Sequence, residues 1–114
     1  MIERFDIVYL HSTSLDKRIV KRVIAFPDEE IEYIDEKLYI DGDYNEEPFL
    51  IEKNLNEEIL TGDFKYIVSD GLFVLGDNRR NSTDSRVFGE VSFEEIFGKR
   101  GLRIYPLSHL DRVK

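Results

Sequence analysis

Residues 76–86 read GDNRRNSTDSR and directly follow the apolar run 72–75, which reads LFVL. Charged, amide and hydroxyl side chains fill this segment, so they can hydrogen-bond to one another and to the backbone and hold a loop in one shape. A rigid polar loop at the end of a strand is a common place for a functional site. A solvated turn is the alternative, because turns are also rich in Asp, Asn and Ser.

Most of the chain around this loop carries strand signals. Runs of β-branched and aromatic residues, bounded by turn residues, predict strands at 5–10, 18–26, 30–34, 37–40, 65–68, 71–75 and 102–105. Asp35 and Glu36 lie between two alternating runs and predict a tight hairpin. The predicted fold class is therefore mostly β, with an antiparallel sheet in a single domain of residues 1–114.

Helix signals are weaker. Ser92 and Glu95 fit a capping box, which predicts a short helix near the C-terminus that Gly98 ends. Residues 52–60 predict one or two helical turns. Between Gly42 and Gly71 the apolar pattern weakens, so this part of the chain is predicted to leave the main sheet.

Composition excludes several classes of function. The net charge is −8 and acidic residues outnumber basic ones 24 to 16, which argues against nucleic acid as a partner. The acidic residues concentrate in 28–63, which indicates a solvated surface. The chain has no cysteine, so disulfides and thiolate metal sites are excluded. No apolar run approaches the about 20 residues that cross a bilayer, so the chain as given is expected to be soluble.

The sequence predicts no metal or cofactor. Residues 41–52 place oxygen ligands at the spacing of a calcium-binding loop, but Glu46 stands where that loop needs glycine and Pro48 interrupts it. A solvated exit from the hairpin is the better interpretation. His11 and His109 are too isolated to indicate a metal site or a catalytic triad.

Lys21 stands inside the apolar strand 18–26. A strand period of two places Arg22 on one face and Lys21 on the other, with the apolar residues Ile19, Val23 and Ala25. A lysine in this setting usually extends along the sheet to water. If it is instead buried without a counter-ion, its pKa falls and the neutral amine can take a proton from a hydroxyl group. Ser82 is the candidate neighbour that would orient the amine.

Together, these segments resemble bacterial type I signal peptidase, the membrane-anchored serine protease that removes signal peptides with a Ser/Lys dyad. Residues 20–27 are similar to the lysine box of that family, and residues 76–86 follow its Gly-Asp-Asn-Arg…Ser…Asp-Ser-Arg box. Residues 4–8 resemble its Arg-Gly-Asp-Ile-Val box, and residues 98–106 its closing strand. The resemblance runs nearly end to end, with residues 43–70 as the variable insertion of the family.

The resemblance implies a role for each matching residue. Lys21 would be the general base, and Ser82 would hydrogen-bond to its amine and orient it. Ile19 and Val20 would present backbone to the substrate, a preprotein signal peptide that lies along this edge as an added strand. The resemblance also implies catalysis without metal or cofactor at the extracytoplasmic face of the cell membrane. Supporting ion pairs would come from the charged residues Arg22, Asp77, Arg79, Asp84 and Arg86.

The chain departs from the family pattern at several places. Phe5, Ala25 and Asp28 stand where the family has glycine. The larger departure concerns the nucleophile, because the catalytic serine of the family lies in a Ser-Met-x-Pro-Thr box upstream of the Arg-Gly-Asp-Ile-Val box and just beyond the membrane anchor. The resemblance therefore implies that serine and anchor lie upstream of Met1, and that this chain by itself is inactive.

Two other functions remain open at this point. A non-catalytic homologue would keep the fold and bind extended peptides, or assist the assembly of surface proteins. A self-cleaving repressor-type protease also uses a Ser/Lys dyad, but the loop 76–86 and the lack of a DNA-binding segment disfavour it.

Overall fold

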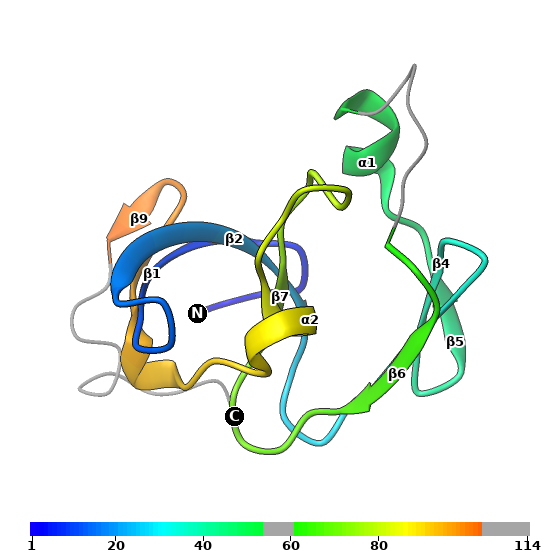
Figure 1. Ribbon diagram of the computed structural model, residues 1–114, viewed down its shortest axis with the longest axis horizontal. Helices are drawn as coiled ribbons and strands as arrows, with labels where there is room; N and C mark the ends of the chain where they lie inside the picture. Colours follow the sequence, from blue (N-terminus) through cyan, green and yellow to red (C-terminus); the bar gives the residue numbers. More distant parts are fainter. Residues whose placement is uncertain (54–60, 104–114) are drawn as a thin grey trace.

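A computed structural model describes residues 1–53 and 61–103 of the chain. Two antiparallel sheets hold most of the regular secondary structure in this part (Figure 1), which confirms the predicted mostly β class. The first sheet has the strand order β7-β2-β1-β8-β9 and carries Lys21 on β2. Its strands, in that order, are Phe73–Leu75, Lys17–Ala25, Ile7–Ser12, Ile96–Lys99 and Leu102–Arg103.

The second sheet has the order β5-β4-β3-β6. Its strands are Asp43–Asn45, Lys37–Ile40, Glu30–Ile34 and Phe64–Ile67. The hairpin between β3 and β4 is confirmed, since Asp35 and Glu36 both have positive φ, 52° and 64°, as a two-residue turn between twisted strands requires. The part of the chain that leaves the first sheet begins earlier than predicted, because β3 already belongs to the second sheet.

At a bulge in β2, the buried side chains of this strand change from one hydrophobic core to the other. The register of β2 against β7 shifts between Val23 and Ala25. Val23 packs into the core of the first sheet, whereas Ile24 and Ala25 both pack into a second core that β2 and β7 share with β3 and β4. The prediction that Ala25 shares a face with Lys21 was wrong, because a bulge inserts a residue and resets the alternation of side chains.

The helices are short. They are α1, Pro48–Lys53, α2, Ser85–Phe88, and a single 3-10 turn at Phe93–Glu95. The capping box at Ser92 is present, but Gly98 lies in β8 instead of ending a helix, because the chain turns extended at Ile96 and pairs with β1. Residues 54–60 and 104–105, parts of two predicted elements, lie outside the described residues. Within the described ranges, no helix has the length and apolar content needed to cross a bilayer.

Two of the residues that stand where the resemblance implies glycine adopt a backbone conformation that favours glycine. Phe5 has φ 72° and Asp28 has φ 70°. Two hydrogen bonds hold Phe5 in place: its N–H donates to the Val23 carbonyl at 2.8 Å, and its carbonyl accepts from Nη1 of Arg22 at 2.8 Å. The Phe5 ring lies 5.2 Å from the ring of Phe49. Phe5 thus adopts a left-handed turn and also makes an aromatic contact.

This conformation leads to a stability prediction that compares two substitutions of the same residue. Phe5→Ala and Phe5→Gly both remove the ring, but only glycine relieves the left-handed backbone, so the glycine variant should be more stable by about 1 kcal/mol. Denaturant unfolding measures the difference. The matched pair Arg18→Ala and Arg18→Gly, in strand β2, should show the reverse order, and the same order at both positions would contradict the assignment of backbone strain to Phe5.

Candidate active site

Lys21 sits half-buried on β2, opposite Val8 of β1. Its Nζ donates a hydrogen bond to Oγ of Ser82 at 3.0 Å. Among the described residues, no carboxylate lies within ion-pair distance of this amine. Burial lowers the pKa of Lys21; the Asp84 carboxylate opposes this effect, Arg86 and Lys17 add to it, and the net result is a pKa below the ordinary value. The amine can therefore lose its proton more easily than a surface lysine.

Gly76, the first residue of the polar loop, makes the contact between Lys21 and Ser82 possible. A Cβ atom at this position would overlap Oγ of Ser82 and would lie 3.3 Å from Nζ of Lys21. The missing side chain lets the loop bring the hydroxyl against the amine. Glycine is needed here because Ser82 lies too close for a side chain at this position, and not because the backbone needs extra conformational freedom.

An ion pair between Arg22 and Asp77 joins β2 to the start of the loop. Nε of Arg22 donates to Oδ1 of Asp77 at 2.9 Å, and Nη2 donates to Oδ2 at 2.7 Å. The guanidinium also lies 4.0 Å from the centre of the Phe49 ring, a cation–π contact. Lys21 and the neighbouring Arg22 thus contact the same loop from opposite faces of one strand.

Asp84 and Arg86 close the loop at its other end. The guanidinium of Arg86 donates to both oxygens of Asp84, each at 2.9 Å. The same carboxylate accepts from the backbone N–H of Gly76 at 3.0 Å. Burial by itself would raise the pKa of Asp84, but the hydrogen bonds from Arg86 and Gly76 outweigh it, and the net pKa lies below the ordinary value. Asp84 therefore stays ionised and fixes both ends of the loop.

The terminal nitrogens of Arg79 find their partners outside the loop. Its side chain is 0% exposed, and Nη2 donates to Oε2 of Glu47 at 3.0 Å. Nη1 lies within hydrogen-bond distance of the hydroxyls of Thr61, at 3.1 Å, and Tyr33, at 3.3 Å, while Nε donates to the carbonyl of Gly76 at 2.8 Å. The local ion pairing expected from the sequence is therefore replaced, for this residue, by a buried network with the second sheet.

Glu47, Tyr33 and Thr61 were missed by the sequence analysis. Glu47 belongs to the acidic region that the composition indicated as a solvated surface, yet its side chain is only 6% exposed. Tyr33 donates to Oε2 of Glu47 at 2.7 Å, and burial raises the pKa of its hydroxyl well above the ordinary value. No local pattern in the sequence distinguishes these residues from the solvated ones, because their burial depends on an arginine far along the chain.

A shallow depression of about 410 Å³ lies beside the amine of Lys21, with Ile19 of β2 in its wall and the polar loop opposite. The strand β7 pairs with β2 only between Arg22 and Ala25. Residues 17–21 of β2 therefore have an edge on the β7 side that no strand of the described residues covers. In an antiparallel strand, half of the backbone N–H and C=O groups point toward each edge, so this segment can accept an added strand.

The comparisons with known proteins agree on one family. The family model described as signal peptidase, peptidase S26, matches residues 1–105. The chain is 42% identical over 115 residues to signal peptidase I of Bacillus caldolyticus, and this match covers 92% of the chain. It is 38% identical over 119 residues to signal peptidase I U of Bacillus subtilis strain 168, and this match covers 97% of the chain. The crystal structure of a signal peptidase I from Enterococcus faecalis V583 superposes with a TM-score of 0.80 at 37% identity, over 87% of this chain and 96% of that one.

The matches to these relatives do not extend over their whole length. In both Bacillus proteins the aligned region is 63% of the relative. The chain thus corresponds to somewhat less than two thirds of each relative.

The buried position of Arg79 generates a second stability prediction. Glu47→Ala should lower the free energy of unfolding by about 3–5 kcal/mol, because it leaves a buried guanidinium without its counter-ion. Denaturant unfolding at neutral pH measures the loss. The control is Glu30→Ala, which removes the partner of Lys65 in a surface pair at 3.8 Å with side chains 56% and 39% exposed, and should cost less than about 1 kcal/mol. Equal losses in the two variants would show that the Arg79 network does not hold the loop.

Proposed function

Because the chain belongs to the signal peptidase family, peptidase S26, we propose that its lysine site cleaves peptide bonds with Lys21 as general base and a serine as nucleophile. One observation carries the proposal. The Lys21 amine is half-buried and has a lowered pKa. It donates a hydrogen bond at 3.0 Å to the hydroxyl of Ser82, which orients it. A carboxylate in that position would keep the amine charged. A neutral, oriented amine is what a general base next to a serine requires.

The reaction follows from the placement of this amine. Neutral Lys21 accepts the proton of the serine hydroxyl as the serine oxygen forms a bond to the carbonyl carbon of the substrate. The resulting ammonium then gives this proton to the leaving amine as the peptide C–N bond breaks, which leaves an acyl-enzyme ester. Lys21, neutral again, takes a proton from water as the water oxygen forms a bond to the ester carbonyl carbon. The ammonium then returns this proton to the serine oxygen as the ester C–O bond breaks, which releases the acyl product as a carboxylic acid and restores the free serine and the neutral amine. In this scheme, Ser82 keeps Nζ in position during these proton transfers.

The substrate in this proposal is an exported preprotein with its signal peptide in extended form. The uncovered edge of β2 at residues 17–21 would pair with it, so that Ile19 and Val20 present backbone and the depression beside Lys21 receives a side chain. Main-chain pairing of this kind gives affinity for many sequences, and the shape of the depression selects the side chains next to the cleaved bond.

The proposal extends to the complete protein. The serine would come from a segment that precedes Met1, together with an anchor that holds the domain at the extracytoplasmic face of the cell membrane. The support for this part is that the chain matches 63% of the length of its relatives. No metal or cofactor takes part in the scheme.

The activity prediction concerns the chain extended by the segment that carries the serine. Lys21→Met keeps the length and apolar stem of the side chain but removes the base, so signal-peptide cleavage should fall by at least about 100-fold. Ser82→Ala should slow cleavage by about two- to tenfold, the value of one hydrogen bond. Cleavage of a synthetic preprotein followed by gel electrophoresis measures both rates.

Lys65→Met is the matched control, because this exposed lysine lies on β6 of the second sheet and should leave the rate unchanged. Circular dichroism verifies that each variant is folded. The 114-residue chain without the added segment should not cleave the substrate. An unchanged rate in Lys21→Met would refute the assigned base, and an extended protein that binds the substrate without cutting it would favour the peptide-binding homologue.

The electrostatics of the site generate a prediction about pH. Lys17 lines the same depression, and its positive charge lowers the pKa of Lys21. Lys17→Gln removes this charge and thereby raises the pKa of Lys21, so less of the amine is neutral at a given pH. The acidic limb of the kcat/KM profile should move to higher pH, with a rate about twofold lower at neutral pH and low salt.

Salt and a second lysine provide the controls for this pH effect. High salt should shrink the difference between Lys17→Gln and the unmodified protein, because the interacting charges are partly exposed. Lys65→Gln, which removes one positive charge from the other sheet, should leave the profile in place. A limb that moves to lower pH in Lys17→Gln would contradict Lys21 as the titrating base.

A further inference from the structure

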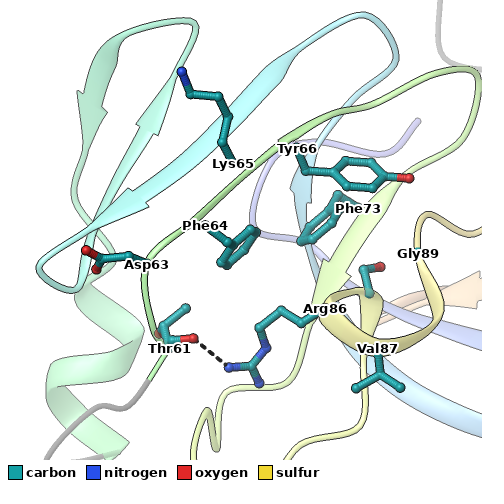
Figure 2. A pocket seen from close by; sticks show the side chains of 10 residues that line it. Thr61, Asp63, Phe64, Lys65, Tyr66, Phe73, Arg86, Val87 and Gly89 are labelled. Carbon is teal, nitrogen blue, oxygen red and sulfur yellow. Dashed lines mark hydrogen bonds between the residues drawn. The ribbon is translucent and has the colours of Figure 1, made fainter.

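A second cavity, of about 520 Å³, lies between β6 and α2 (Figure 2). Three aromatic rings form its apolar wall: Phe64 and Tyr66 from β6 and Phe73 from β7. The ring centres of Phe64 and Phe73 are 5.7 Å apart in a stacked arrangement, and those of Tyr66 and Phe73 are 4.9 Å apart. This volume falls in the range of small-molecule sites, and mutually packed rings offer a fixed surface on which a further ring can stack.

Arg86 supplies the polar wall of the cavity. Nε and Nη2 donate to Asp84, and Nη1 donates to the carbonyl of Thr61 at 3.2 Å. These bonds use one N–H on each nitrogen, whereas a guanidinium carries a second N–H on both terminal nitrogens. The side chain is 17% exposed and lines the cavity, so its remaining N–H groups are hydrogen-bond donors for a ligand there.

The other charged side chains of the wall point elsewhere. In Figure 2, Asp63 and Lys65 both extend away from the space that the rings enclose, while Arg86 reaches across it toward Thr61. The Asp63 carboxylate accepts from the backbone N–H of Asp35 at 3.0 Å, and Lys65 lies 3.8 Å from Glu30. Among the described side chains that line the cavity, Arg86 is thus the charged group directed at its interior.

We propose that this cavity is a binding site for an aromatic ring that carries a carboxylate. The ring would stack on Phe64 and Phe73, and the carboxylate would accept hydrogen bonds from both terminal nitrogens of Arg86, the bidentate geometry in which arginine recognises carboxylates. Asp84 holds the adjacent edge of the guanidinium through Nε and Nη2, so the arginine is already oriented before the ligand arrives. The site is separate from the depression beside Lys21, whose lining residues it does not share.

The test uses N-acetylphenylalanine as the probe and the amide NMR spectrum of the chain as the readout. Millimolar probe should shift the amide signals of Lys65, Tyr66, Val87 and Gly89 in a saturable way. N-acetylphenylalaninamide, which lacks the charge, and N-acetylalanine, which lacks the ring, should each bind severalfold more weakly. Equal binding of the amide or of the alanine analogue would overturn the proposal, as would the absence of shifts at these residues.

A charge-reversal pair at Val87 tests the location. Val87 lines the cavity and is 71% exposed, so either charge can be introduced without disturbing the fold. Val87→Asp should weaken binding of N-acetylphenylalanine by about threefold and Val87→Lys should tighten it by about threefold. Tyr44→Asp, at an exposed position on β5, should leave the affinity unchanged. Equal affinities in the two Val87 variants would place the probe elsewhere and overturn the proposal.

A tetrapeptide that ends in phenylalanine with a free carboxylate distinguishes the source of the ligand. Binding at least as tight as that of N-acetylphenylalanine indicates that the natural ligand is the C-terminus of a polypeptide. Binding of the single residue alone indicates a small aromatic acid. Both results support the site, because both require the ring and the charge.

Discussion

The arrangement of the site depends on the buried hydrogen bonds and ion pair of the Arg79 guanidinium. It belongs to the polar loop, yet its partners Glu47, Tyr33 and Thr61 all come from the part of the chain that forms the second sheet and its connections. A buried charge is tolerated only when its hydrogen bonds are complete, so the loop and the second sheet must dock in one geometry to satisfy it. The same guanidinium holds the carbonyl of Gly76, the residue that gives Ser82 access to Lys21.

Around Lys21, one group holds the amine in position and other groups set its pKa. Position is supplied by a neutral hydroxyl, that of Ser82, while the surrounding charges act at longer range on the pKa. Asp84, the nearest opposing influence, is already held by Arg86 and by backbone N–H groups. A carboxylate in direct contact would have fixed the amine just as well, but it would have stabilised the protonated form of Lys21.

The segment 76–86, which follows β7 and runs into α2, also links the two candidate sites. The positive charge of Arg86 lowers the pKa of Lys21, and the same side chain lines the aromatic cavity. A short, polar segment can serve both sites because four of its charged residues are held in three ion pairs: Asp77 with Arg22, Arg79 with Glu47, and Asp84 with Arg86. The rigidity of the loop therefore comes from ion pairs and not from apolar packing of its own.

The sequence by itself determined the features that depend on neighbouring residues. Alternation placed most of the strands, with β3 and β4 at their observed bounds, but it missed β5 and β8. The dipeptide Asp35–Glu36 specified the hairpin, and the period of two placed Lys21 and Arg22 on opposite faces of one strand. The polar residues in 76–86, taken together with residues 4–8, 20–27 and 98–106, were enough to indicate the family. These signals are local, because side-chain direction and turn conformation are set within a few bonds.

Only the tertiary structure decided which distant groups meet. The bulge that moves Ala25 to the second core, the burial of Glu47 inside an acidic stretch, and the aromatic wall that β6 and β7 build beside Arg86 all involve partners far apart along the chain. The capping box at Ser92 was read correctly as a start, but pairing of β8 with β1 ended the helix after one turn. In each case the free energy of a long-range contact, which leaves no periodic trace in the sequence, outweighed the local preference.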